Sequence, residues 1–522
     1  MSRLACLLSA LWVSSACGGG DSSPGDDASP NPTVDAQPPG IDAACGPGCA
    51  DAAPPACGDG TCTAGVMGED CATCSADCGV CPMGCPSGNC ITLDSQTTYQ
   101  TMRGWEVVGW MDNAAPGFAS FAPLVLDQVV DLGINRVRLE VRSGVEHPMD
   151  NYQRLLSGQI THDEWRCLRY ATVNDNADPN TIDPAGFHFT ELDERIDELI
   201  LPLRQRVEAR GESLFVLLTY VSFTAQIGGC GAFIHDDQPE EYGELMLAVH
   251  QHMESRYGFV PDAVEAVLEP DNATEWDATE LGQAVAAAGT RLAAAGYTPS
   301  FVVPGAMCMS NAVPWIDDMA AVPGALDYLS EVSYHRYCGA SLANLHGVRD
   351  KAAEHGVFPS MLEWWEPGNG HDVLHEDLVE GDSTAWEISV LGDINAGPDS
   401  IAATDIDNSD PGDPVVTLTD KAKLLSQYFR RVRAGATRIA ATSTAPSLRP
   451  VAFINPGGGW TVVVNATAPD TFDVANLPAG TYAVDYTTST DHAVPAPDVT
   501  LAAGDQLSAT IPAPGVLTIH AR

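Results

Sequence analysis

The sequence contains few basic residues and no long hydrophobic run after its N-terminus. Its 522 residues include 25 Lys and Arg against 70 Asp and Glu, which gives a formal net charge of −45 at pH 7. A surface this negative repels phosphate, so the composition argues against binding of nucleic acid or of anionic lipid headgroups. No stretch beyond the N-terminus approaches the ~20 apolar residues of a membrane-spanning helix. No GxGxxG motif follows the first predicted strand, which removes the main reason to expect a dinucleotide-binding fold.

The remaining composition is that of a globular protein with an ordinary core. Hydrophobic residues make up 45% of the chain and charged residues 18%, which is typical of a folded domain surrounded by water. The acidic residues are spread along the chain rather than gathered in one tail, so they indicate a solvating surface. The chain is long enough for one large domain with smaller appendages.

The first 17 residues have the three parts of an export signal. Arg3 precedes an apolar run over 4–13, and the small residues 14–16 lead to Cys17. This end resembles a bacterial lipoprotein signal, and the resemblance implies a lipid anchor at Cys17 as the sole contact with a membrane. Ser14 stands where such signals usually carry leucine, so plain secretion remains the alternative. Either route predicts an exported protein, secreted or on the cell surface, in an oxidising compartment.

Two further segments precede the folded body. Residues 18–56 are rich in Gly, Ser, Pro, Asp and Ala and predict a disordered linker. Residues 57–90 hold eight closely spaced cysteines, which in an exported chain indicate disulfide bonds, with a metal knuckle as the alternative. The segment also resembles a cysteine-rich stalk module of exported bacterial proteins, which implies a spacer. The eight are Cys57, Cys62, Cys71, Cys74, Cys78, Cys81, Cys85 and Cys90.

Residues 105–436 alternate short β-rich runs with long helix-period segments. Strands that alternate with helices of this length predict βαβ units and a parallel sheet. Eight such units favour a closed (β/α)8 barrel, an α/β fold, over an open sheet. The expected strands are 105–110, 134–141, 213–221, 263–268, 300–303, 329–335, 359–363 and, more weakly, 400–405. The expected helices are 118–132, 192–209, 239–256, 279–295, 342–355, 384–394 and 420–434.

The last part of the chain, 437–522, changes to a period of two with Gly and Pro turns. The alternating runs are 451–455, 460–465, 482–487 and 515–520. This pattern predicts a C-terminal antiparallel β-sandwich domain. Residues 91–104, rich in Thr and Gln, precede the barrel and are expected to add a strand to the sandwich.

Two carboxylates fall at the C-terminal ends of predicted barrel strands, where active sites of such barrels lie. Glu269 ends the fourth strand and Glu363 the seventh. A pair of carboxyl groups that flanks one bond is what glycoside hydrolysis requires, one to donate a proton and one, ionised, to attack or stabilise the sugar carbon. A surface-loop role for Glu269, a structural ion pair for Glu363 and the nearby Glu366 as a rival are the alternatives.

The Glu-Pro after strand four, the Glu after strand seven and the closing sandwich resemble the retaining glycoside hydrolases of clan A. The segment 428–439 with 451–456 and 462–465 is similar to the barrel-to-sandwich junction of glycoside hydrolase family 30, as is the approach over 98–104. This resemblance, over residues 91–522, implies that Glu269 is the general acid/base and that Glu363 is the nucleophile.

The same resemblance assigns roles to three further residues. Arg138 resembles the second-strand arginine that keeps the nucleophile ionised. His335 and Tyr337 resemble the sixth-strand pair that hydrogen-bonds near the nucleophile. The alternatives are a barrel salt bridge for Arg138, a satisfied core histidine at 335 and rim packing for Tyr337.

Two positions depart from the family pattern. Leu268 stands where an asparagine usually contacts the sugar 2-hydroxyl, and Asn272 is the candidate to compensate. The eighth strand, taken as 400–405, lacks the usual tryptophan platform. Among the barrel tryptophans, Trp110, Trp364 and Trp365 are candidates to stack on sugar rings, with core packing as the alternative for each.

The loops on the predicted rim carry three further expectations. We expect disulfides between Cys167 and Cys230 and between Cys308 and Cys338, because each cysteine follows a strand and the compartment is oxidising. The long loop over 142–188 is the candidate lid. The run 405–413 is acidic enough for calcium but misses EF-hand spacing.

These observations together predict a retaining hydrolase, without cofactor or catalytic metal and monomeric, that cleaves a β-glycosidic bond in a neutral polysaccharide or oligosaccharide. A non-catalytic carbohydrate-binding or adhesive surface protein on a degenerate barrel is the alternative, which Leu268 and the missing tryptophan favour. An unrelated barrel chemistry would need a metal or phosphate motif that the sequence does not show.

Overall fold

The computed structural model describes residues 88–223, 235–273, 275–368 and 370–522. The predicted signal, linker and most of the cysteine-rich segment therefore lie outside the described residues, as does Cys230. Within the described part of the chain, no helix combines the length and apolar character needed to cross a membrane.

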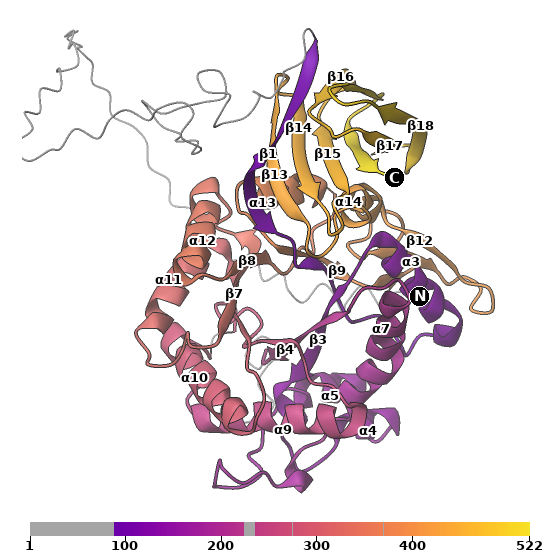
Figure 1. Ribbon diagram of the computed structural model, residues 1–522. Helices are drawn as coiled ribbons and strands as arrows, with labels where there is room; N and C mark the ends of the chain where they lie inside the picture. The colour runs from indigo at the N-terminus through magenta and orange to yellow at the C-terminus, as the bar shows by residue number, and fades with distance from the viewer. Residues whose placement is uncertain (1–87, 224–234, 274, 369) are drawn as a thin grey trace, which may run out of the picture. The chain divides into compact units, whose positions relative to one another are not determined.

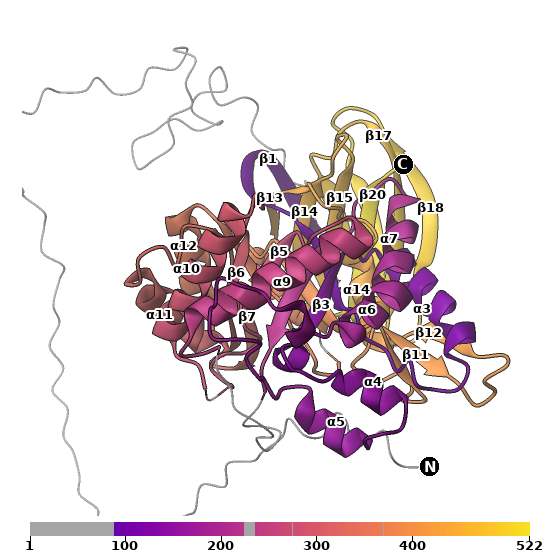
Figure 2. The same ribbon diagram turned by 90° about the horizontal axis from the view of Figure 1, so that it is seen from below.

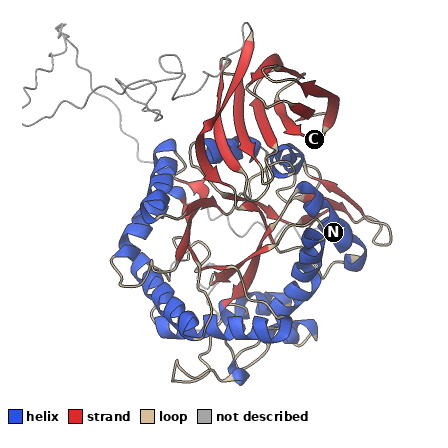
Figure 3. Ribbon diagram, viewed as in Figure 1, coloured by secondary structure: helices blue, strands red, loops and turns tan. Residues whose placement is uncertain are grey.

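Eight parallel strands close into a barrel, with helices around it (Figures 1 and 3). This confirms the predicted fold class. The strands are β2 (Gly104–Val108), β3 (Arg136–Arg142), β4 (Phe215–Val221), β5 (Ala263–Glu265), β6 (Phe301–Cys308), β7 (Leu329–Cys338), β8 (Phe358–Met361) and β9 (Ala385–Val390).

The surrounding helices bury one apolar face each against the strands. In α3, Phe121, Val125 and Val129 recur at helical spacing and are fully buried. Asp277 and Glu280 form a capping box that fixes the start of α10. The helices are α3 (Phe118–Leu132), α6 (Thr190–Arg195), α7 (Leu201–Glu208), α9 (Pro239–Tyr257), α10 (Ala278–Ala294), α11 (Met309–Ala320), α12 (Leu342–His355), α13 (Gly370–Val379) and α14 (Asp420–Phe429).

The eighth barrel strand was predicted at the wrong place. It is β9, over residues expected to be helical, whereas 404–407 forms β11 in a separate sheet with β10 (Gly392–Ile394) and β12 (Val415–Leu418). All six residues of β9 are buried. Residues 386–390 alternate apolar and polar, but a run this short also fits a helical segment, so periodicity alone does not separate the two. Helices α11 and α13 were also missed.

The C-terminal domain is built on a nine-stranded sheet of order β18-β17-β20-β15-β14-β13-β1-β16-β19. Its N-terminal contribution is β1 (Asn89–Thr101), which pairs antiparallel with β13 and parallel with β16. The other strands are β13 (Thr437–Ser443), β14 (Leu448–Ile454), β15 (Trp460–Ala466), β16 (Asp470–Ala475), β17 (Gly480–Thr488), β18 (Val494–Leu501), β19 (Leu507–Ile511) and β20 (Gly515–Ala521).

The barrel and this sheet share a continuous interior. Val451, Phe453 and Val463 of the sheet belong to the same buried cluster as the barrel core. Gln427 at the end of α14 donates to Asp485 and Thr487, both at 2.9 Å, and its carbonyl accepts from a sheet threonine at 2.8 Å. These contacts hold the sheet against one side of the barrel.

The loops after the strands form the rim on which the site lies. The loop after β3 contains η2 (Ser143–Val145), α4 (Asn151–Leu156) and α5 (His162–Leu168), and both helices lie at one end of the barrel (Figure 2). Cys308 and Cys338 form a disulfide between β6 and β7, with Cα atoms 4.5 Å apart, which confirms that predicted bridge. The lid role of the loop over 142–188 remains a prediction.

Candidate active site

The barrel interior below the rim is filled by charged side chains in pairs. The guanidinium of Arg136 lies 2.8 Å from Glu106 and 2.9 Å from Glu331, and all three side chains are fully buried. Burial alone would raise the pKa of Glu331, but the charge of Arg136 and its hydrogen bonds lower it. A buried ion pair with this many hydrogen bonds offsets its desolvation cost.

Glu269 follows β5 in a turn that holds its backbone in the left-handed region. Its φ is 47°. Its N–H donates to the Gly305 carbonyl at 3.0 Å, and its carbonyl accepts from the N–H groups of Asn272 and Ala273 at 2.9 Å. Such a backbone conformation persists only where surrounding contacts fix it. The turn therefore fixes the position and direction of the Glu269 Cα–Cβ bond.

The Glu269 carboxyl lies in a nearly closed environment and is 3% exposed. Its Oε1 lies 2.9 Å from Nδ1 of His335, and its Oε2 accepts from Asn272 Nδ2 at 2.9 Å. Burial raises the pKa of Glu269 and the charge of Glu363 raises it further, while the hydrogen bond with His335 opposes them. A carboxyl with a raised pKa keeps its proton at higher pH, as a proton donor requires.

Glu363 differs from Glu269 in that a guanidinium contacts one of its oxygens. Arg138 Nη1 lies 2.7 Å from its Oε2, and the Tyr337 hydroxyl donates to its Oε1 at 2.8 Å. Burial raises the pKa of Tyr337, so the phenol stays protonated and remains a donor. A guanidinium and a phenol on one carboxylate stabilise its negative charge.

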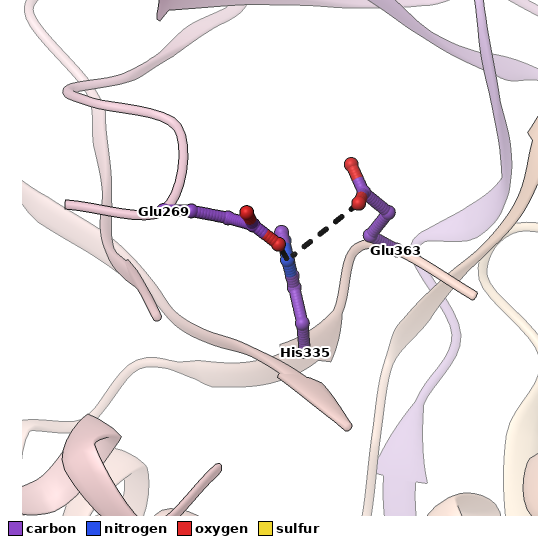
Figure 4. A group of neighbouring side chains, drawn as sticks. All are labelled: Glu269, His335 and Glu363. Atoms are coloured by element: carbon purple, nitrogen blue, oxygen red, sulfur yellow. Dashed lines mark hydrogen bonds and ion pairs between the residues drawn. The ribbon is translucent and has the colours of Figure 1, made fainter. Parts of the chain in front are cut away.

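His335 stands between the two carboxylates (Figure 4). Its Nδ1 lies 2.9 Å from Glu269 and 4.0 Å from Glu363. Burial alone would lower the pKa of His335, but the charges of Glu363 and Glu269 raise it. One oxygen of each carboxylate and one nitrogen of His335 lie within 4.8 Å of one another, so the two carboxyl groups can face the same substrate bond.

Arg138 is held from inside the barrel by carboxylates that the sequence analysis did not single out. Its guanidinium lies 3.5 Å from Glu140 and 3.6 Å from Glu387. Neighbouring Glu265 accepts from Thr219 at 2.8 Å, and burial raises the pKa of Glu265 to about 7. An available signal was the presence of Glu within otherwise apolar barrel strands, since buried charges are rare unless paired.

The three candidate tryptophans are half-buried and pack against two different clusters. Trp110 and Trp365 are half-buried against the cluster of Val108 and Val390. Trp364 packs against the main barrel core, and its carbonyl accepts from the buried ammonium of Lys421 at 3.0 Å. The structure thus brings together Arg138, Glu269, Asn272, His335, Tyr337 and Glu363. Trp364 and Trp365 follow Glu363 directly in the chain, and Trp110 packs against the same cluster as Trp365.

The two departures noted in the sequence have structural counterparts. Leu268 is buried with Tyr170 and Val221, so this position offers no polar group to a sugar hydroxyl. Asn272 binds the carboxylate of Glu269. The missing tryptophan platform was inferred from residues 400–405, which are not the eighth barrel strand. The true eighth strand carries Trp386 near its start, where its indole is fully buried and donates to Asp377.

Glu269, His335 and Glu363 also have the ligand types and spacing of a metal site. The guanidinium of Arg138 already provides a positive charge 2.7 Å from Glu363, and a cation in the group would be repelled by it. The arrangement therefore fits proton transfer and nucleophilic attack better than metal binding.

A parallel barrel with two unlike carboxylates at its rim, closed by a β-domain, is a glycosidase-like architecture. The structure matches the catalytic domain of GH30 xylanase C from Talaromyces cellulolyticus with a TM-score of 0.59 and 16% identity, over 83% of this chain and 100% of the other. It matches a GH30 endoxylanase from Clostridium papyrosolvens with a TM-score of 0.57 and 16% identity, over 84% of this chain and 100% of the other.

A third match is the endo-β-1,6-glucanase BT3312, with a TM-score of 0.55 and 17% identity, over 83% of this chain and 94% of the other. The chain therefore has the fold of glycoside hydrolase family 30, as the sequence resemblance implied. No family model matches the sequence, and a search of curated proteins finds no relative.

Proposed function

We propose that this chain is a retaining glycoside hydrolase that cleaves a β-glycosidic bond in a neutral polysaccharide or oligosaccharide. The observation that carries the proposal is the approach of Glu269 and Glu363 to within 4.8 Å, oxygen to oxygen. Retaining enzymes hold their carboxyl groups about 5 to 5.5 Å apart, whereas inverting enzymes leave about 6.5 to 9.5 Å for a water molecule. The raised pKa of Glu269 suits a proton donor, and the contact of Glu363 with the guanidinium of Arg138 suits a nucleophile.

In the first step Glu269 is the general acid and Glu363 the nucleophile. Glu269 gives its proton to the glycosidic oxygen as the bond to the sugar carbon breaks, and Glu363 attacks that carbon from the other side. The product is a covalent glycosyl ester on Glu363. Arg138 and Tyr337 orient the attacking carboxylate through their contacts of 2.7 and 2.8 Å.

In the second step Glu269, now ionised, accepts a proton from water as the water attacks the ester carbon. Esterification removes the charge of Glu363, which is one of the causes that raise the pKa of Glu269. The pKa of Glu269 therefore falls after the first step, and the same carboxyl becomes a base when a base is needed.

A second candidate function is carbohydrate binding without hydrolysis, and Leu268 favours it. The side chain at this position is buried among apolar neighbours, so a hydrogen bond to the sugar 2-hydroxyl is missing there. Such contacts strengthen in the transition state and are worth several kcal/mol. A barrel that lacks such a hydrogen bond can still bind carbohydrate, but it hydrolyses the glycosidic bond more slowly.

The purified chain should be screened against a panel of neutral polysaccharides, and the best substrate used for Glu363→Gln, Glu269→Gln and the matched control Glu366→Gln. For a hydrolase, E363Q loses turnover by orders of magnitude, E269Q loses most on poor leaving groups, and E366Q stays near wild type. Binding to a substrate without turnover in every protein, including wild type, would support the second candidate instead.

The cellular setting is part of the same proposal. An exported chain, anchored at Cys17 or secreted, would meet polysaccharide outside the cell, and the Cys308–Cys338 disulfide suits an oxidising compartment. A matched structure is a conserved exported protein from Bacteroides fragilis. Metabolic labelling with a fatty acid, compared between wild type and Cys17→Ala, separates anchoring from secretion.

A further inference from the structure

A second group of carboxylates lies away from the catalytic pair, between the long loop after β3 and helix α9. Glu146 and Asp175 come from the loop and Glu241 from the first turns of the helix. One oxygen of each lies within 4.8 Å of the other two. Glu146 and Glu241 are buried, and Asp175 is half-buried.

The loop is shaped to bring its two carboxylates to this point. The backbone N–H of Asp175 donates to Glu146 Oε1 at 3.0 Å, and Glu146 pairs with Phe187 in an isolated β-bridge. Gly186 lies so close that a Cβ there would stand 2.3 Å from the Cβ of Asp175. The absence of a side chain at Gly186 thus lets Asp175 approach.

Glu244 adds a fourth carboxylate from the same face of α9, one turn after Glu241. It is 1% exposed, and neither of its oxygens accepts a hydrogen bond from the described residues. Glu241 Oε2 and Asp175 Oδ1 are likewise buried without a donor.

Two basic side chains lie beside this cluster, and neither forms hydrogen bonds with all of it. His235 Nε2 lies 2.9 Å from Glu146. Arg291 makes its hydrogen bonds with the carbonyls of Glu240 and Pro179 and with Asn180. Three carboxylate oxygens within 4.8 Å of one another, with the buried oxygens of Glu244 one helical turn away, form a set of ligands that suits a cation.

We propose that Glu146, Asp175, Glu241 and Glu244 form a structural calcium site that fastens the loop over 142–188 to helix α9. Carboxylate oxygens are the ligands that Ca²⁺ prefers, and it binds them at about 2.3 to 2.6 Å. Opposite ligands of such an ion are then about 4.6 to 5.2 Å apart, a span compatible with the observed 4.8 Å limit. This inference is independent of the proposed hydrolase activity.

Calorimetric titration of the chelator-treated full chain with CaCl2, and separately with MgCl2, tests the site. We expect one Ca²⁺ per chain with a Kd of about 10⁻⁵ to 10⁻³ M, weaker Mg²⁺ binding, and a rise in Tm with added Ca²⁺, because an ion that binds only the folded state stabilises it. The double variant E241Q/E244Q should lose binding and the Tm rise, and the exposed neighbour variant E240Q should keep both.

The variant D175N, in the loop, should also lose Ca²⁺ binding. It provides the test if E241Q/E244Q does not fold. Absence of a binding heat and of a Tm change in the wild type at about 10 mM Ca²⁺, well above the Kd range of such sites, would overturn the proposal. So would an equal Ca²⁺ effect in wild type and E241Q/E244Q. The cluster would then be a set of carboxyl groups that share protons.

Discussion

Nη1 of Arg138 lies 2.7 Å from Oε2 of Glu363, and this contact links the charged interior of the barrel to its rim. Arg138 is 1% exposed and extends from β3, the second barrel strand, while Glu363 follows β8, the seventh. The same guanidinium also faces Glu387 and Glu140. One buried arginine therefore positions the proposed nucleophile and neutralises the carboxylates beneath it.

Arg138→Gln should lower both stability and activity. Removal of the guanidinium leaves buried carboxylates without a counter-charge, which costs about 3 to 5 kcal/mol of unfolding free energy. Urea unfolding measures this loss. The control R206Q breaks the exposed pair with Asp127 at 2.7 Å and should cost less than about 1 kcal/mol. Equal losses in the two variants would contradict the role given to Arg138.

Tyr337→Phe should reduce activity and lower the free energy of unfolding by at most about 3 kcal/mol. The variant removes the hydroxyl that donates to Glu363 at 2.8 Å. A hydrogen bond to a charged group is worth about 1.5 to 3 kcal/mol, so kcat/KM should fall about 10- to 100-fold. Tyr482→Phe, which removes a hydroxyl bound to the Pro478 carbonyl in the β-domain, is the control and should leave kcat/KM unchanged.

Glu265 should make the folded state less stable as the pH rises. Burial raises its pKa to about 7 from 4.5, so between these values the folded chain holds a proton that the unfolded chain has lost. Stability from this group is therefore fully present below pH 4.5 and is lost as the pH rises through 7, by about 3 kcal/mol in all.

Unfolding free energies measured from pH 4.5 to 7.5 test this sign. Glu265→Gln should remove the corresponding part of the slope, and the exposed variant Glu208→Gln should keep it. A slope that is the same in E265Q and wild type would show that Glu265 does not titrate in this range.

Loss of the rim disulfide should destabilise the barrel. Cys308 and Cys338 are separated by 30 residues, and closure of a loop of that length restricts the unfolded chain by about 3 to 4 kcal/mol. The double variant C308A/C338A should lose stability by this amount in denaturant unfolding. Unchanged stability would mean that the bridge does not form in the purified protein.

The sequence was sufficient to predict the barrel because most of its strands are bounded by turns and by helices of clear period. Strand β9 was missed although residues 386–390 alternate apolar and polar, because so short a run also fits a helical segment and its polar residues are buried inside the barrel rather than exposed. The carboxylates Glu269 and Glu363 could be predicted from their places after strands. The carboxylates beneath them could not, because Glu265 on β5 and Glu387 on β9 come near Arg138 on β3 only when separate strands close into a barrel.

The proposed calcium site also could not be predicted from the sequence. Its four carboxylates come from a loop and a helix that are distant in sequence, and they match no short motif. The acidic run 405–413, the candidate for calcium in the sequence, belongs to neither group of potential metal ligands in the described residues. Spacing along the chain detects ligands only when one local segment supplies them.

The most direct test of the central claim is mass spectrometry of the chain after reaction with activated 2-deoxy-2-fluoro-β-glycosides, which trap the glycosyl ester of a retaining enzyme. The account predicts one adduct, on the peptide that carries Glu363, and none in E363Q. An adduct on Glu269 or another carboxylate, or turnover of substrate with inversion of the anomeric carbon, would contradict it.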